Sequence, residues 1–257
     1  MELRNSVIIV TGASSGIGAA TARELARHDA IVVLAARRAD SLDSLAREIE
    51  EQGGRALAVP TDVGRRSDID HLVQTVLERY HRIDGLVNNA GVGGGSSMAD
   101  SDDKMERIVM VNLLGPARCA QAVLPTMRER NRGVIVNIGS VAGDVGVSGI
   151  YSASKFGLRG LNDALRREVW KENIDVVLIQ PGFIRTPMTK GVKMPMVEPE
   201  VVARAVVEAM QRPRRKLFVP WPYAPLAVLA KCFPWLADRI VGSGAAQKRY
   251  REREQIT

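Results

Sequence analysis

Residues 6–18 read Ser-Val-Ile-Ile-Val-Thr-Gly-Ala-Ser-Ser-Gly-Ile-Gly, and residues 19–28 continue with a helical pattern. A strand, a glycine-rich turn and a helix in this order form a cradle for a phosphate, because the helix N-terminus attracts anions. Gly12 allows a tight turn, Gly16 lets the backbone approach a pyrophosphate, and Gly18 lets the helix pack closely on its strand. The spacing Gly-x3-Gly-x-Gly is not the commoner Gly-x-Gly-x2-Gly, so an ordinary tight loop stays open as an alternative.

The second apolar run, residues 31–36, ends at Arg37 and Arg38, and a carboxylate follows only at Asp40. An acidic residue at this position would hold the adenosine ribose of NAD, whereas arginine suits the additional phosphate of NADP. We therefore predict a preference for NADP(H) over NAD(H). The alternative is that two surface arginines simply open the next helix.

Strand and helix patterns alternate along the rest of the chain. Further strands are expected at 55–60, 85–88, 134–138, 174–179 and 217–219, and helices at 41–52, 67–81, 102–130, 151–172 and 201–210. We expect Ser67 to cap its helix and Pro116 to bend the long one. This alternation predicts an α/β fold with a doubly wound parallel sheet, Rossmann-like, in one domain over residues 1–220. Residues 221–257 form an apolar and then basic extension, expected to be helical.

The composition is that of an ordinary globular protein, with 257 residues and a formal charge of +7. We see no signal-peptide core and no apolar stretch of the roughly 20 residues that span a bilayer. Cys119 and Cys232 match no metal spacing, so we predict buried reduced thiols, no metal site and a cytoplasmic location. The excess of Lys and Arg lies in the last quarter of the chain, and this charge alone does not identify a binding partner.

A second motif lies at residues 137–155. Tyr151 and Lys155 are four residues apart, so in a helix both side chains share one face. A nearby ammonium favours the phenolate, which brings proton exchange closer to neutral pH. Ser140 follows the 134–138 strand, at the edge where parallel sheets bind ligands. Alone, the Tyr-x-x-x-Lys pair would be read as a solvated helix face.

Taken together, these stretches resemble the short-chain dehydrogenase/reductase family, in its compact single-domain branch, from about Val7 to Val219. The motifs that carry the resemblance occur in the family's order: the turn at 11–18, Asp62, the run 88–91, Asn112, Ser140, Tyr151, Lys155 and the turn at 181–182.

The resemblance implies a role for each matching residue. The pyrophosphate is expected against Gly12, Ser14, Ser15, Gly16, Ile17 and Gly18. Arg37, with Arg38 behind it, is expected at the 2′-phosphate, and Asp62 and Val63 beside the adenine. The adenosine half and the central sheet are expected to be supported by Asn89, Ala90 and Gly91, and the nicotinamide end to be held by Pro181, Gly182, Ile184 and Thr186.

The same resemblance implies the catalytic set. Ser140 is expected to hydrogen-bond the substrate oxygen, and Tyr151 to act as the general acid in reduction and the base in oxidation. Lys155 is expected to bind the nicotinamide ribose and lower the pKa of Tyr151, and Asn112 to hold a water that links Lys155 to solvent. The family usually places its serine thirteen residues before the tyrosine, and here the spacing is eleven. We expect Ser140 to reach the site nevertheless, with Ser148 as the weaker candidate.

The predicted function is NADP(H)-dependent interconversion of a secondary alcohol and a ketone or aldehyde. The apolar extension and Met188, Met194 and Met196 suggest a hydrophobic substrate, although such methionines also serve loop packing. An NADP(H)-binding regulator without turnover is the alternative. Nucleic-acid binding is not expected, because no recognition helix or basic-aromatic motif is present.

The partners expected beyond the substrate follow from the resemblance and from the extension. Relatives usually pair through the helices that correspond to 102–130 and 151–172, so a homodimer or homotetramer is implied. Residues 221–236 mix Trp, Tyr, Phe and Leu with lysine, a mixture that can lie on a membrane surface. Packing on the domain or on a partner subunit is the favoured interpretation of this extension.

Overall fold

The computed structural model describes residues 1–93 and 100–241 of the chain. Its centre is a parallel seven-stranded sheet with the order β3-β2-β1-β4-β5-β6-β7. The strands are β1 (Val7–Thr11), β2 (Ile31–Ala36), β3 (Arg55–Pro60), β4 (Gly85–Asn88), β5 (Gly133–Ile138), β6 (Ile174–Pro181) and β7 (Lys216–Val219). The α/β fold with a doubly wound parallel sheet is confirmed.

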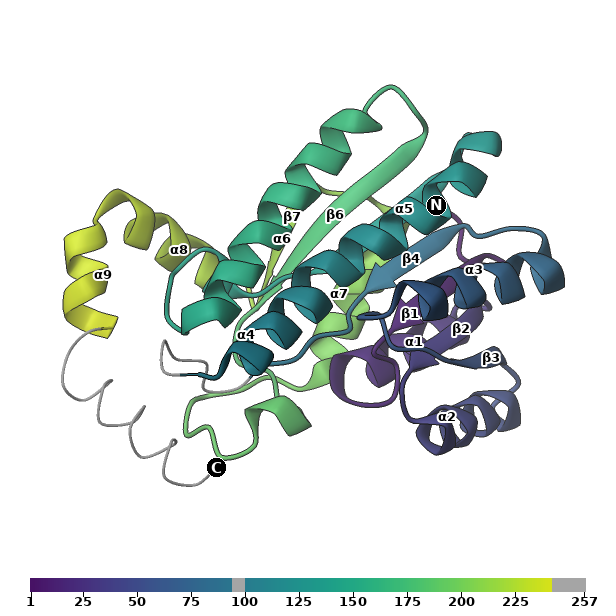
Figure 1. Cartoon of the computed structure of the whole chain (residues 1–257), viewed down its shortest axis with the longest axis horizontal. Helices are drawn as coiled ribbons and strands as arrows, with labels where there is room; N and C mark the ends of the chain where they lie inside the picture. The colour runs from purple at the N-terminus through teal and green to yellow at the C-terminus, as the bar shows by residue number, and fades with distance from the viewer. Residues whose placement is uncertain (94–99, 242–257) are drawn as a thin grey trace.

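Helices cover both faces of this sheet (Figure 1). They are α1 (Gly16–Arg27), α2 (Ala39–Glu51), α3 (Arg66–Tyr80), α4 (Asp102–Val109), α5 (Gly115–Glu129), α6 (Gly149–Glu168), α7 (Pro199–Gln211), α8 (Tyr223–Cys232) and α9 (Pro234–Val241). The helix α3 begins one residue earlier than expected, with Arg65 as its N-cap, so the predicted Ser67 cap is wrong.

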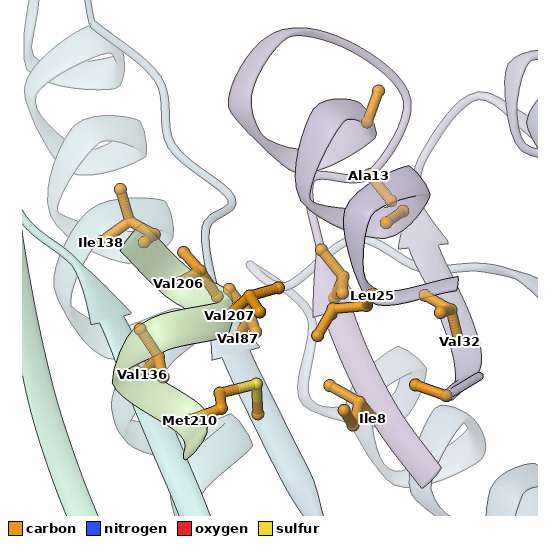
Figure 2. Close-up of a cluster of buried hydrophobic side chains, with 14 of the residues drawn as sticks. Ile8, Ala13, Leu25, Val32, Val87, Val136, Ile138, Val206, Val207 and Met210 are labelled. Atoms are coloured by element: carbon orange, nitrogen blue, oxygen red, sulfur yellow. The ribbon is translucent and has the colours of Figure 1, made fainter. Parts of the chain in front are cut away.

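One face of the sheet packs against α1, α2 and α7. Figure 2 shows this cluster, in which Leu25 of α1 and Val206 and Met210 of α7 lie over side chains of β1, β4 and β5. These strands are buried on both faces, and they are accordingly runs of Val, Ile and Leu without alternation. The burial of this apolar surface is the main favourable contribution to folding.

The opposite face packs against α3, α5 and α6 through Ile69, Val123, Met127 and Leu165, among others. The expected single helix over 102–130 is interrupted by a π-helical turn at Met110–Leu114, which separates α4 from α5. Pro116 has no N–H to donate, so the regular α-helical hydrogen bonds must change in this region. By length and composition the stretch Asp102–Glu129 could cross a membrane, but half of its most apolar window is buried.

A chain of buried amides fixes α6 to the sheet. Asn88 Nδ2 donates to Asn137 Oδ1 at 2.9 Å, and Asn137 Nδ2 donates to Asn162 Oδ1 at 2.9 Å. These three residues belong to β4, β5 and α6. Because buried polar groups bond only at specific positions, the chain sets where α6 lies along β5.

The C-terminal helices α8 and α9 project from the sheet layers (Figure 1). Ala227 is the buried residue of α8, whereas Trp221, Leu226 and Trp235 are more than half exposed. Helical structure in the extension was expected.

The prediction that both cysteines are buried is wrong for one of them. Cys119 is buried, but Cys232 is exposed at the end of α8. The basic residues expected in the tail, Lys248, Arg249, Arg251 and Arg253, lie outside the described residues.

Candidate active site

The first turn and the end of β4 are tied together at the carboxyl edge of the sheet. The Thr11 hydroxyl accepts hydrogen bonds from the N–H groups of Asn89 and Ala90, each at 3.0 Å. In return, Asn89 Nδ2 donates to the carbonyls of Thr11, at 2.9 Å, and Gly12, at 3.2 Å. β1 pairs with β2 on one side and β4 on the other, and ligands bind at such a switch point.

The glycines of this turn leave no room for side chains. Gly12 has a φ of +66°, and a Cβ there would lie 2.8 Å from the Ala90 Cα. Gly16 has a φ of +56° and faces Thr186. A Cβ at Gly18 would collide with the Gly12 carbonyl oxygen, so Gly18 acts from behind the turn and lets α1 approach it.

Cations and a carboxylate surround the end of β2. Arg38 Nη2 donates to Ser14 Oγ at 3.1 Å, which brings this guanidinium to the glycine-rich turn. Asp62 accepts from the Gly64 N–H at 2.9 Å and from Arg107 Nη2 at 2.9 Å. Burial alone would raise the pKa of Asp62, but the Gly64 and Arg107 hydrogen bonds and the charges of Arg107 and Arg37 together hold it below its usual value.

Ser140, Tyr151 and Lys155 come together where β5 meets α6. Ser140 Oγ accepts from the Ala142 N–H at 3.1 Å and is hydrogen-bonded to the Tyr151 side chain. Lys155 Nζ donates to the Ile138 carbonyl at 3.0 Å and lies 6.0 Å from the centre of the Tyr151 ring. The short loop does not keep Ser140 from Tyr151.

Burial is the largest cause of the pKa shifts of Tyr151 and Lys155. It raises the pKa of Tyr151, an effect that the Ser140 hydrogen bond partly offsets. Burial also lowers the pKa of Lys155 to about 8. The pKa of Tyr151 is therefore raised in this structure, with burial as its largest cause, and the expected lowering by Lys155 stays a prediction.

Asn112 lies in the π-helical turn and is completely buried. Its amide clamps the main chain after β4: Oδ1 accepts from the Val92 N–H at 2.9 Å, and Nδ2 donates to the Val92 carbonyl at 2.8 Å. Nδ2 also donates to Ser154 Oγ at 3.2 Å. The side chain thus fixes the segment beside Gly91 and α6, and the water expected at Asn112 stays a prediction.

One cavity of about 420 Å³ runs along this edge of the sheet. Of the predicted residues, it is lined by Gly12, Ser14, Ser15, Gly16, Ile17, Arg37, Arg38, Asp62, Val63, Asn89, Ala90, Gly91, Ser140, Tyr151, Lys155, Pro181, Gly182, Ile184 and Thr186. Gly18 and Asn112, which were also predicted, do not line the cavity. Met188 also lines the cavity, unlike the other two methionines singled out.

Sequence reasoning missed several residues of this wall: Ala36, Thr61, Val92, Arg107, Val111, Ile138, Gly139, Pro187 and Thr189. Most of them adjoin a predicted residue at a strand end, so the strand ends themselves were the signal. Arg107 had no such signal, because it lies in the last turn of α4, away from any strand end, and meets Asp62 through an ion pair.

The residues present fit a dinucleotide phosphate cofactor. The turn at Gly12 and Gly16 is a cradle that a Cβ would fill, and it opens the N-terminal end of α1. Arg37 and Arg38 line the cavity just after β2, whereas Ser140 lines it after β5 and Pro181 and Gly182 line it at the end of β6, on the other side of β1 and β4 in the sheet.

Comparison with known proteins agrees with this arrangement. Residues 6–196 match the family model described as short chain dehydrogenase. An uncharacterized oxidoreductase, YxnA of Bacillus subtilis, is 34% identical over 98% of this chain and 76% of its own length. Ketoacyl reductase HetN of Nostoc is 35% identical over 84% of this chain and 79% of its own length.

Two solved structures are also similar. A metagenomic short-chain oxidoreductase in complex with NADP has a TM-score of 0.76 and 34% identity, covering 85% of this chain and 98% of its own. An alcohol dehydrogenase from Thermococcus sibiricus, complexed with 5-hydroxy-NADP, has a TM-score of 0.76 and 27% identity, covering 84% and 96%.

The chain belongs to the short-chain dehydrogenase/reductase family, as the motifs indicated. It is an oxidoreductase that acts on CH–OH donors.

Proposed function

We propose that the protein uses NADP(H) to interconvert a secondary alcohol and a ketone or aldehyde, with a hydrophobic substrate. The observation that carries the proposal is the cavity itself, which is lined by the hydrogen-bonded pair Ser140 and Tyr151, by the buried ammonium of Lys155 and by the Pro181–Gly182 turn. When bound, NADPH supplies the hydride, and the protein supplies orientation and a proton.

In this proposal Tyr151 gives its hydroxyl proton to the substrate oxygen during reduction and takes it back during oxidation. Ser140 holds the same oxygen through its hydroxyl, so that both donors meet the charge that develops there. Lys155 places a buried positive charge behind Tyr151 and binds the nicotinamide ribose. Asn112 holds the water that carries protons between Lys155 and solvent.

Arg37 and Arg38 support the choice of NADP(H). Two guanidinium groups follow β2 where a carboxylate would favour the free ribose hydroxyls of NAD(H). Both solved relatives described above were crystallised with NADP or a derivative of it. Both arginines are exposed and line the cavity, so a phosphate bound there can meet their guanidinium groups.

A hydrophobic substrate is supported by Met188, which lines the cavity, since methionine adapts to apolar ligands. The relative HetN is named a ketoacyl reductase, which also supports a carbonyl substrate. A panel of ketones, aldehydes and the matching alcohols, ranging from polar to long-chain, tests this directly. NADPH binding without turnover of any member would support the regulator instead.

The cofactor experiment compares wild type with Arg37→Ala by titrating NADPH and NADH against intrinsic fluorescence. Exposed Arg47→Ala is the matched control, since Arg47 lies on the outer side of α2. We expect NADPH to bind wild type more tightly than NADH and Arg37→Ala to lose about tenfold or more of that preference. Equal affinity of wild type for both cofactors would refute the proposed preference.

A homodimer or homotetramer is proposed to form through α5 and α6. The outer face of α6 carries Ala153, Gly160 and Ala164, all exposed, and small residues allow another helix to approach closely. Light scattering on the purified protein measures the assembly. A cytoplasmic location remains a prediction, as does the absence of bound metal or nucleic acid. For the exposed apolar side chains of α8 and α9, packing on the domain or on a partner subunit remains the favoured proposal, and binding to a membrane surface the less favoured one.

A further inference from the structure

Asp144 lies in the loop between Ser140 and Tyr151, and its side chain is fully buried. Three cations from three different elements converge on it. Arg159 Nη1 of α6 donates to Oδ1 at 2.6 Å, and Lys216 Nζ of β7 lies 2.8 Å from Oδ2. Lys231 of α8 donates to the same carboxylate. A buried carboxylate with three cationic partners stays charged and stays in place.

Gln180 joins this carboxylate to the active site. It is the penultimate residue of β6 and is fully buried. Its Nε2 donates to Asp144 Oδ2, and its Oε1 accepts from the Ser140 N–H at 3.2 Å. One side chain therefore connects the charged cluster to the main chain of the serine that contacts Tyr151.

The charge of Asp144 determines which way the Gln180 amide points. An ionised carboxylate accepts hydrogen bonds only, so it requires the NH₂ end of the amide. The carbonyl end is then directed toward the Ser140 N–H, which needs an acceptor. In the flipped amide, an NH₂ group would face the Ser140 N–H and a carbonyl would face the carboxylate, and both contacts would be repulsive.

We propose that Gln180 is a positioning residue for Ser140, oriented by Asp144, and that Lys231 makes α8 part of this support. The inference rests on the proposed function of Ser140 as a donor to the substrate oxygen. A second contact ties the other end of α8 to the site, because the Tyr223 ring packs directly on Gly182. The C-terminal extension therefore supports both the serine and the Pro181–Gly182 turn.

The decisive experiment is a double-mutant cycle with Gln180→Leu and Ser140→Ala. A leucine keeps the volume but leaves the Ser140 N–H without its acceptor. We expect Gln180→Leu to lower kcat about tenfold in the wild-type background, with NADPH affinity nearly unchanged. In the Ser140→Ala background the same change should cost less than about twofold, because the hydroxyl that it positions is gone. Equal losses in both backgrounds would overturn the proposal.

The exposed end of the network offers a milder variant that does not threaten folding. Lys231→Met should lower kcat about two- to threefold, because a half-exposed ion pair is worth little, and Lys231→Arg should restore it. Arg239→Met on α9 is the matched control, since it also removes one exposed cation from the extension. Identical kinetics of Lys231→Met and Arg239→Met would remove α8 from the proposed support.

Amide hydrogen exchange gives a readout that needs no substrate. Peptides that cover residues 139–144 should exchange faster in Gln180→Leu than in wild type, because the Ser140 N–H has lost its acceptor. Unchanged exchange would refute the positioning role. Faster exchange in a protein that turns over no carbonyl or alcohol would leave the positioning role intact and overturn the proposed function.

Discussion

Lys155→Met should make the protein without cofactor more stable at pH 7. Burial lowers the pKa of this ammonium from 10.5 to about 8, so folding at neutral pH forces a charge into an environment that disfavours it. The difference of about 2.5 units corresponds to about 3 kcal/mol at 1.36 kcal/mol per unit. For a domain of this size that is a rise in Tm of about 5–10 °C.

The dependence on pH distinguishes this effect from simple gain of apolar burial. Below pH 8 Lys155 is protonated in both states, and the full cost is present. Between about pH 8 and 10.5 the unfolded chain still holds the proton that the folded chain has released, so the stability of wild type rises with pH. The advantage of Lys155→Met should therefore shrink across this window.

Calorimetry on wild type and Lys155→Met at pH 7, 8, 9 and 10 measures that difference. Lys171→Met, at an exposed lysine, corrects for the general effect of removing one positive charge. A Tm difference that stays constant from pH 7 to 10 after this correction would refute the reasoning. A lower Tm for Lys155→Met at pH 7 would show instead that the Nζ bond to the Ile138 carbonyl outweighs the cost of burial.

Three further outcomes are expected. Ser140→Ala should lower kcat/KM about 100-fold and Ser148→Ala less than threefold, because Ser140 is hydrogen-bonded to the Tyr151 phenol and lines the cavity, whereas Ser148 is not among the residues that line it; steady-state kinetics checks this, and equal losses would contradict the assignment. Gly18→Ala should destabilise the fold by about 1–3 kcal/mol in denaturant unfolding, because its Cβ would meet the Gly12 carbonyl, and a wild-type midpoint would speak against that contact. Gly182→Ala should displace the Tyr223 ring and weaken NADPH binding in a fluorescence titration, and unchanged affinity would show that the turn adjusts independently.

The sheet could be predicted because its five central strands, β2, β1, β4, β5 and β6, are mostly buried on both faces. Such strands carry continuous apolar runs, and the expected bounds of β2, β3 and β4 match the observed ones. The position of Ser140 followed from the same property, since parallel strands bring their carboxyl ends to one edge. The place of the turn at 181–182 in the site was implied by the family resemblance.

Contacts between distant side chains carried no comparable signal. Arg107 meets Asp62 across 45 positions, and Lys231 meets Asp144 across 87. Neither pair shows any periodicity or motif that would predict it. Asp144 carries no sequence signal of its own, because a single carboxylate among glycines is ordinarily solvated, and only the fold reveals that it is buried.

The buried charges of Asp144 and Lys155 have opposite surroundings, and this contrast bears on function. Asp144 is surrounded by cations, which hold its pKa below the usual value despite burial, so it is a fixed element. The contact shown for Lys155 Nζ is a neutral carbonyl, and its pKa is depressed. An ammonium in that position is poised to stabilise negative charge, whether on the Tyr151 phenolate or on a substrate oxygen. The substitution that raises Tm should therefore also abolish turnover, because the proposed mechanism requires this unfavourable charge.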